Sequence, residues 1–187
     1  MFGIRDYRPR FFTNCKDFLS NNQYLIKRII GQKIEKIYWV WGEENNDWVK
    51  DYPVVIKLSN GNCTLCANNF SEFSIGWNNI DFSSKIRKDS FYGACNWKEY
   101  QVRQLDLIKD KEILSVEIIN FLPRFIKDYP IYNKKDAKII KLMGFLHGVG
   151  FIFDNVAMVI VNGLEDNNIV FFEQDYPAYY NRIIING

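Results

Sequence analysis

The stretch from residue 38 to residue 52, YWVWGEENNDWVKDY, combines residue types that do chemistry with residue types that bind. Neighbouring carboxylates such as Glu43 and Glu44 are the kind of pair that acid–base hydrolysis uses, and Glu165 and Asp166 form a second pair. Adjacent acids in hairpin loops are usually solvated, so catalysis by either pair is not favoured. The tryptophans and tyrosines instead favour binding to a protein, because they bury a large rigid area at small entropic cost.

Histidine and cysteine offer no recognisable catalytic or metal-binding motif. His147 is the one histidine of the chain, and no local signature of a Ser-His-Asp or Cys-His arrangement accompanies it. Cys63 and Cys66 form a CxxC motif in a predicted strand, where residues three apart point to opposite faces and cannot chelate one ion. Cys15 and Cys95 are scattered, whereas zinc needs four ligands. We therefore expect structural thiols, no metal, no cofactor and no enzyme.

Nucleotide and nucleic-acid binding have little support. The chain has no GxxxxGK(S/T) loop and no GxGxxG motif after a strand. In residues 5–12, three arginines alternate with a tyrosine and two phenylalanines, a pattern that can bind single strands. The isoelectric point of about 8.2 is only modestly basic, and no RRM, KH or helix-turn-helix signature is present. Single-stranded nucleic acid is therefore the third and least favoured alternative.

The charged residues divide the chain into four blocks. Residues 1–40 carry a net charge of +5 and residues 83–141 also +5. Residues 41–82 and 142–187 each carry −4, and both acidic segments contain a predicted β-hairpin. If the two acidic segments lie together, they form one face that attracts a basic partner and repels nucleic acid.

Hydrophobic periodicity and turn signals predict an α+β fold with a mostly antiparallel sheet and two or three helices. Ser20 and Gln23 form a capping-box pattern, and Gly31 suits the position after a helix, so a helix is predicted from 20 to 31. Two more helices are predicted at 97–108 and 135–144. The predicted strands are 33–41, 54–58, 63–70, 72–82, 113–122, 149–153, 157–162, 169–174 and 182–185.

Two features of the first strands are specific. Within 33–41, Ile37, Trp39 and Trp41 share one face, since side chains alternate along a strand. We expect Trp39 and Trp41 to belong to the core, and Trp48, in a polar connection, to be an exposed anchor. Asn60 and Gly61 predict a tight hairpin, because both tolerate positive φ.

The order helix, strand, connection, hairpin occurs twice. IIGQKIEKIYW is similar to LIKDKEILSVEI, and VVIKLSNGNCTLCA is similar to MVIVNGLEDNNIVFF. We hypothesise a single domain over 1–187 with an internal repeat of 20–82 and 97–174, the alternative being that this common order recurs by chance.

Targeting signals are not evident in the sequence. No apolar run reaches the roughly 18 residues that span a membrane, and MFGIRDYRPRFF lacks the apolar region of a secretory signal. We expect a cytoplasmic protein with reduced cysteines.

Three stretches, IGQKIEKIYWVW, SEFSIGWNNIDF and GFIFDNVAMVIVNGLEDNNIVF, resemble small cytosolic bacterial proteins of the polymorphic-toxin immunity type. The resemblance is one of general residue pattern and extends over residues 30–174. It implies an α+β protein that binds and blocks a toxin, as in contact-dependent growth inhibition, and it implies no catalytic residue. The acidic segments would then suit a basic toxin, for instance a nuclease.

The leading hypothesis is an immunity protein that neutralises a cognate toxin by stoichiometric binding. The alternative is a small-molecule-binding or enzymatic domain, whose sign would be an aromatic-lined cleft with a perturbed carboxylate. The candidate partner-binding residues are the acidic and aromatic side chains of the two acidic segments: Glu43, Glu44, Asp47, Trp48, Asp51, Tyr52, Glu165, Asp166, Glu173 and Asp175.

Overall fold

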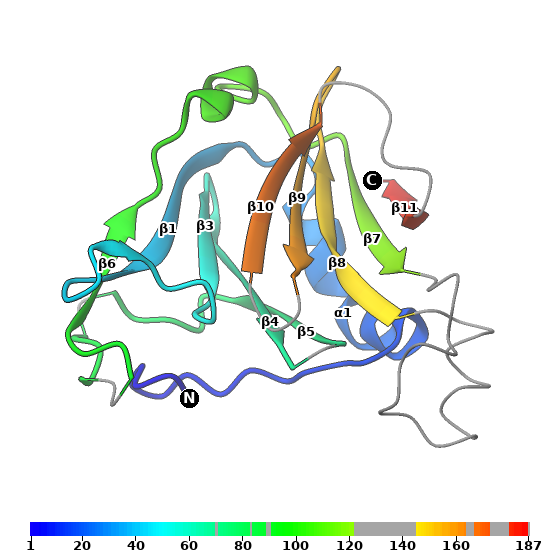
Figure 1. The fold of residues 1–187 in the computed structure, drawn as a ribbon. Coiled ribbons are helices and arrows are strands. Elements are labelled where there is room, and N and C mark those ends of the chain that lie inside the picture. The colour runs from blue at the N-terminus through cyan, green and yellow to red at the C-terminus, as the bar shows by residue number, and fades with distance from the viewer. Residues whose placement is uncertain are drawn as a thin grey trace.

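The computed structural model describes residues 1–69, 71–82, 84–88, 91–121, 145–163, 167–172 and 180–186 (Figure 1). The strands form two antiparallel sheets. The first sheet contains β1 (Ile34–Gly42), β2 (Asp47–Trp48), β3 (Val54–Leu58), β4 (Gly61–Asn68), β5 (Glu72–Trp77) and β6 (Cys95–Glu99). The second contains β7 (Ser115–Phe121), β8 (Phe145–Ile152), β9 (Ala157–Asn162), β10 (Asn167–Phe172) and β11 (Tyr180–Asn186). The mostly antiparallel pairing is as predicted and fits the α+β class, but the strands form two sheets where one was predicted.

The helices are fewer than predicted. The described residues contain one α-helix, α1 (Cys15–Ile29), and one 3-10 helix, η1 (Arg103–Leu107). The helix predicted at 97–108 is wrong, because its first residues belong to β6, which pairs with β1 along Tyr38–Gly42. The helix predicted at 135–144 lies outside the described residues.

The start of α1 also differs from the prediction. Asn14 is the N-cap, and its side-chain oxygen accepts from the backbone amide of Asp17 at 2.9 Å. Ser20 lies inside the helix, where its hydroxyl donates to the carbonyl of Asp17. The predicted end is confirmed: Gly31 follows the C-cap with φ of +80°, a conformation that glycine adopts without strain.

Both sheets have the same strand order. In each sheet four strands form a meander, and a later strand returns to pair with the outer edge of the first one: β6–β1–β3–β4–β5 in the first sheet and β11–β7–β8–β9–β10 in the second. The short β2 adds to the first sheet beside β1. The boundaries of the predicted repeat, 20–82 and 97–174, do not coincide with those of the two sheets. The first sheet extends to β6 and the second sheet extends to β11. The repeat itself stays a prediction, and the shared strand order is its support.

The Asn60–Gly61 signal marks a real hairpin, displaced by one residue. Leu58 pairs with Gly61, so Ser59 and Asn60 form the two-residue loop between β3 and β4. Gly61 has φ of +143°, and a Cβ there would lie 2.6 Å from the ring of Trp77. Glycine is therefore required both by the backbone and by the close approach of Trp77.

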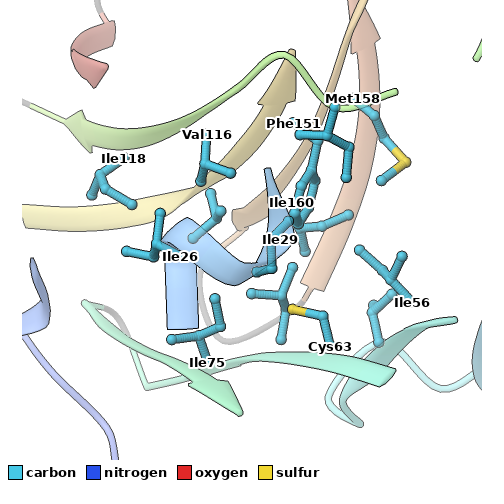
Figure 2. Packing of buried hydrophobic residues seen from close by; sticks show 14 of the residues in the cluster. Ile26, Ile29, Ile56, Cys63, Ile75, Val116, Ile118, Phe151, Met158 and Ile160 are labelled. Atoms are coloured by element: carbon cyan, nitrogen blue, oxygen red, sulfur yellow. The ribbon is translucent and has the colours of Figure 1, made fainter. Parts of the chain in front are cut away.

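One hydrophobic core joins the two sheets. Its buried side chains come from α1, from the first sheet and from the second sheet, and Figure 2 shows them meeting: Ile26, Ile29, Ile56, Cys63, Ile75, Val116, Ile118, Phe151, Met158 and Ile160. α1 contacts both β5 and β7, so it packs against both sheets at once. Neither sheet buries this face without the other, which is what a single domain requires.

A second cluster covers the outer face of the first sheet. Ile4 and Tyr7 from the N-terminal arm pack there with Val40 and Val55 from the sheet. Tyr7 and Phe12 are buried, and the backbone of Phe12 bonds to that of Phe73. These aromatics are therefore not available as stacking platforms for nucleic acid, which removes the main support for that alternative.

Candidate functional site

The acidic stretch folds into an exposed hairpin. Trp41 pairs with Trp48 and Gly42 with Asp47, so residues 43–46 form the loop between β1 and β2. Asn46 has φ of +51°, a conformation that asparagine tolerates. Glu43, Glu44 and Asp47 are all exposed at this tip. We refer to residues 41–48 as the acidic hairpin.

Contacts with β6 and with the segment before it hold the acidic hairpin in place. The carboxylate of Glu43 accepts a hydrogen bond from the side-chain amide of Asn96, and the backbone amide of Glu43 donates to Ala94. Glu44 forms an ion pair with Lys88 at 3.5 Å, and its side chain is 59% exposed. A carboxylate oxygen of Asp47 accepts from the backbone amide of Trp48 at 2.7 Å. These acids are thus positioned locally while they still face solvent.

Asp51 and Tyr52, which follow the acidic hairpin, face inward. Asp51 is half-buried, and its carboxylate accepts a hydrogen bond from the hydroxyl of Tyr92. Tyr52 is 1% exposed and packs in the outer cluster with Phe2 and Tyr92. This corrects the candidate set: Tyr52 has no side-chain surface for a partner, because the N-terminal arm covers it.

The tryptophans of the stretch form one aromatic cluster. Trp48 stacks on Trp39 at a ring-centroid distance of 6.0 Å and meets the faces of Trp41 and Tyr100 edge-on at 5.0 and 5.2 Å. Trp39 is 3% exposed, as predicted for a core residue. Trp41 and Trp48 are both half-buried. Trp48 therefore packs against the core rather than standing free, and Trp41 is less buried than predicted.

Strand register explains why Trp41 lies beside polar groups. Residues directly opposite each other in an antiparallel pair point to the same side. Trp41 lies opposite Asn96 and Trp39 opposite Lys98, so the indoles share a face with both polar side chains. The ammonium of Lys98 lies 3.8 Å from the centroid of the Trp41 ring, a cation–π contact. Sequence reasoning missed Asn96 and Lys98, because it assigned them to a loop and a helix.

A strand of the second acidic segment, β10, is bonded to the first acidic segment through Asn167. Asn167 is fully buried, and its side-chain amide donates to the carbonyls of Lys50 and Tyr52 at 3.0 and 2.9 Å. Its side-chain oxygen accepts from the backbone amide of Ala67 at 2.7 Å. Its own backbone amide also donates to Lys50, at 2.8 Å. The start of β10 is therefore bonded to the chain that follows the acidic hairpin. The candidates Glu165, Asp166, Glu173 and Asp175 lie outside the described residues.

Two cavities are lined by described residues alone. One of about 370 Å³ lies between the start of β1, the end of β6 and η1, with Tyr100 as its one aromatic side chain. Another, of about 420 Å³, is lined by Lys33, Asp110, Lys111, Glu112, Leu114 and Asp154 and has no aromatic residue. Lys36 bonds to Glu99 at 2.8 Å beside the first cavity, which lowers the pKa of that exposed carboxyl. Neither cavity is the aromatic-lined cleft that the small-molecule alternative requires.

The cysteines and His147 occupy packed positions. Cys63 lies in the main core, whereas Cys66 lies on the other face of β4, where burial raises the pKa of its thiol to about 12. Burial also raises the pKa of the Cys15 thiol to about 11. The opposite faces of Cys63 and Cys66 were predicted. Within the described ranges, no group of three or more His, Cys, Asp or Glu side chains is arranged to hold a metal ion.

Comparisons with known proteins do not identify a relative. No protein-family model, no curated protein and no solved structure matches the chain. None of the helices in the described part of the chain is both long enough and apolar enough to cross a membrane.

Proposed function

We propose that the protein is a cytoplasmic immunity protein that neutralises a cognate bacterial toxin by stoichiometric binding. The observation that carries this proposal is the bonding of Asn167, at the start of β10, to Lys50 and Tyr52, which joins a strand of the second acidic segment to the first acidic segment. The sequence resemblance to polymorphic-toxin immunity proteins supplies the class of partner.

The chemistry of the acidic hairpin supports a basic partner. Glu43, Glu44 and Asp47 are exposed at the tip of the acidic hairpin, where Asn96 of β6 donates to Glu43 and the backbone amide of Trp48 donates to Asp47. A preformed acidic surface steers a positively charged protein and raises the association rate. The half-buried indoles of Trp41 and Trp48 border this loop and supply apolar contact area of the kind found at binding hot spots. A toxin with a cationic active site, such as a nuclease domain, fits this surface.

The proposal is tested first by a pull-down with the tagged protein from host cells that express their toxins, followed by mass spectrometry. We expect one stoichiometric partner, which would be the toxic domain of a larger protein, and we expect co-expression of the tagged protein to restore growth to cells that produce that domain. Recovery of no stoichiometric partner, or a partner whose toxicity is unchanged by co-expression, would contradict the proposal.

Charge reversal then tests whether the acidic hairpin makes the contact. In the double variant Glu43→Lys, Asp47→Lys, the association rate constant for the captured partner should fall by roughly tenfold or more and depend less on salt. The matched control is Asp106→Lys, Glu112→Lys, which changes the net charge equally at two exposed acids outside both acidic segments. Equal effects of the two double variants would show that only net charge matters and would remove the hairpin from the interface.

A further inference from the structure

A lysine of the same chain, Lys98, makes a cation–π contact with the ring of Trp41. The ammonium of Lys98 lies 3.8 Å from the ring centroid, and Lys98 is exposed. Lys98 forms no ion pair with any described residue. Its ammonium is instead placed over the aromatic ring of Trp41. An exposed cation–π contact of this kind is weak and is readily exchanged for another cation.

A carboxylate is bonded to the residue that lies opposite Trp41 in the sheet. Asn96 lies directly opposite Trp41 in the sheet, and its amide bonds to the carboxylate of Glu43 at the start of the hairpin loop. Trp48 packs against Trp41 in a T-shaped arrangement, with 5.0 Å between the ring centroids. Trp41, Glu43 and Asn96 thus present an aromatic face, a negative charge and an amide next to one another.

We propose that this face of Trp41 binds an arginine side chain of the partner, and that Lys98 occupies it when the partner is absent. The inference rests on the proposed function, for which it names the chemistry of the partner group. A guanidinium is planar, stacks on an indole better than an ammonium does, and has donors left at its edge for a carboxylate such as that of Glu43. Lysine lacks this combination, so the site selects arginine.

Trp77 provides a matched control within the chain. Its ring also carries a cation, with the guanidinium carbon of Arg28 at 4.4 Å from the centroid. Trp77 is half-buried like Trp41, but the residues around it in sequence, 73–80, include no carboxylate. Removing Arg28 therefore bares an indole and deletes one positive charge without creating the proposed site.

The test is a titration of the ¹⁵N-labelled protein with a hexa-arginine peptide, followed on the five indole N–H signals. We expect a saturable shift of the Trp41 signal, little change at Trp77, and weaker binding of a hexalysine peptide. Lys98→Met should tighten the binding about three- to fivefold, because it removes the competing cation, whereas Arg28→Met should not. Glu43→Gln should weaken the binding of hexa-arginine. In the wild type the signal of the neighbouring Trp48 should shift together with that of Trp41, and in Trp41→Leu the Trp48 signal should not shift.

Equal shifts at Trp41 and Trp77, equal affinity for the two peptides, or equal effects of Lys98→Met and Arg28→Met would overturn the inference. Its failure is distinguishable from failure of the proposed function. A captured toxin that binds Lys98→Met and Trp41→Leu with unchanged affinity leaves the function standing and removes the arginine site. Specific binding of hexa-arginine at Trp41, together with a pull-down that recovers no toxin partner, would leave the arginine site standing and remove the proposed function.

Discussion

At the scale of single residues, His147 combines a polar side chain with a packed position on β8. It is half-buried, and desolvation lowers its pKa to about 4. In the unfolded chain the same imidazole titrates near its ordinary value of about 6.5. Between these two values the unfolded state binds a proton that the folded state does not, so acid favours unfolding. The stability that the neutral imidazole provides is present above pH 6.5 and is lost as the pH falls toward 4.

The first prediction concerns this window. Between pH 7 and pH 5 the free energy of unfolding of the wild type should fall by about 2 kcal/mol more than that of His147→Gln. Urea denaturation at both pH values measures the difference. The carboxylates contribute equally to both proteins, so their contribution cancels when the wild type and the variant are compared. Parallel pH dependence of the two proteins would mean that His147 titrates normally in the folded state.

At the scale of elements, the side chain of Asn167 connects β10 to the first sheet through three hydrogen bonds. Asn167 bonds to the carbonyls of Lys50 and Tyr52 and to the amide of Ala67. A similar bridge exists at the partner position on β9, where the amide of Asn162 donates to the carbonyls of Asn69 and Glu72. Two neighbouring buried asparagines thus connect strands of the second sheet to strands and loops of the first.

The second prediction tests this bridge. Asn167→Ala removes three hydrogen bonds, one of which is the bond that satisfies the buried amide of Ala67, and should lower the free energy of unfolding by about 3 kcal/mol. Asn167→Asp should cost more, because it places a carboxylate against two carbonyl oxygens. Asn168→Ala, on the next residue and the other side of β10, should stay within about 0.5 kcal/mol of the wild type. Chemical denaturation checks all three, and equal losses at 167 and 168 would contradict the bridge.

At the scale of the whole molecule, the two sheets depend on a common core. Ile37, Ile56 and Leu65 of the first sheet pack in one cluster with Val149 and Ile160 of the second. All five tryptophans of the chain lie in strands of the first sheet: Trp39, Trp41, Trp48, Trp77 and Trp97. Tryptophan fluorescence therefore reports on the first sheet alone, whereas circular dichroism reports on both.

The third prediction uses that separation. Ile160→Ala, a cavity in the second sheet, should lower the free energy of unfolding by about 3 kcal/mol. The fluorescence and circular-dichroism transitions should coincide in the wild type and shift together in the variant, because the core is shared. A fluorescence transition that stays in place while circular dichroism becomes biphasic would show that the sheets unfold separately.

Much of the strand content could be predicted from sequence, since it depends on local patterns. The alternation in 33–41 placed Ile37 and Trp39 on one side of β1 and Tyr38 and Val40 on the other, and the structure has them in two different clusters. The hairpin at Asn60–Gly61 and the end of α1 at Gly31 follow from backbone preferences that one or two residues express by themselves. The helix start was misplaced because Ser20 and Asn14 are both acceptable N-caps, and the buried Cys15 and Phe18 decided in favour of Asn14.

The sequence by itself therefore determined the antiparallel strands, the turns that join them and the acidic character of the hairpin. The tertiary structure alone decided that Cys95–Glu99 is a strand. This segment pairs with the edge of β1, and its local sequence pattern does not predict that pairing. It likewise decided that Tyr52 is buried, that Trp48 packs on Trp39, and that Lys98 covers Trp41. Each of these outcomes depends on residues far apart in the chain, and the energy of such contacts becomes definite only when the fold brings the partners together.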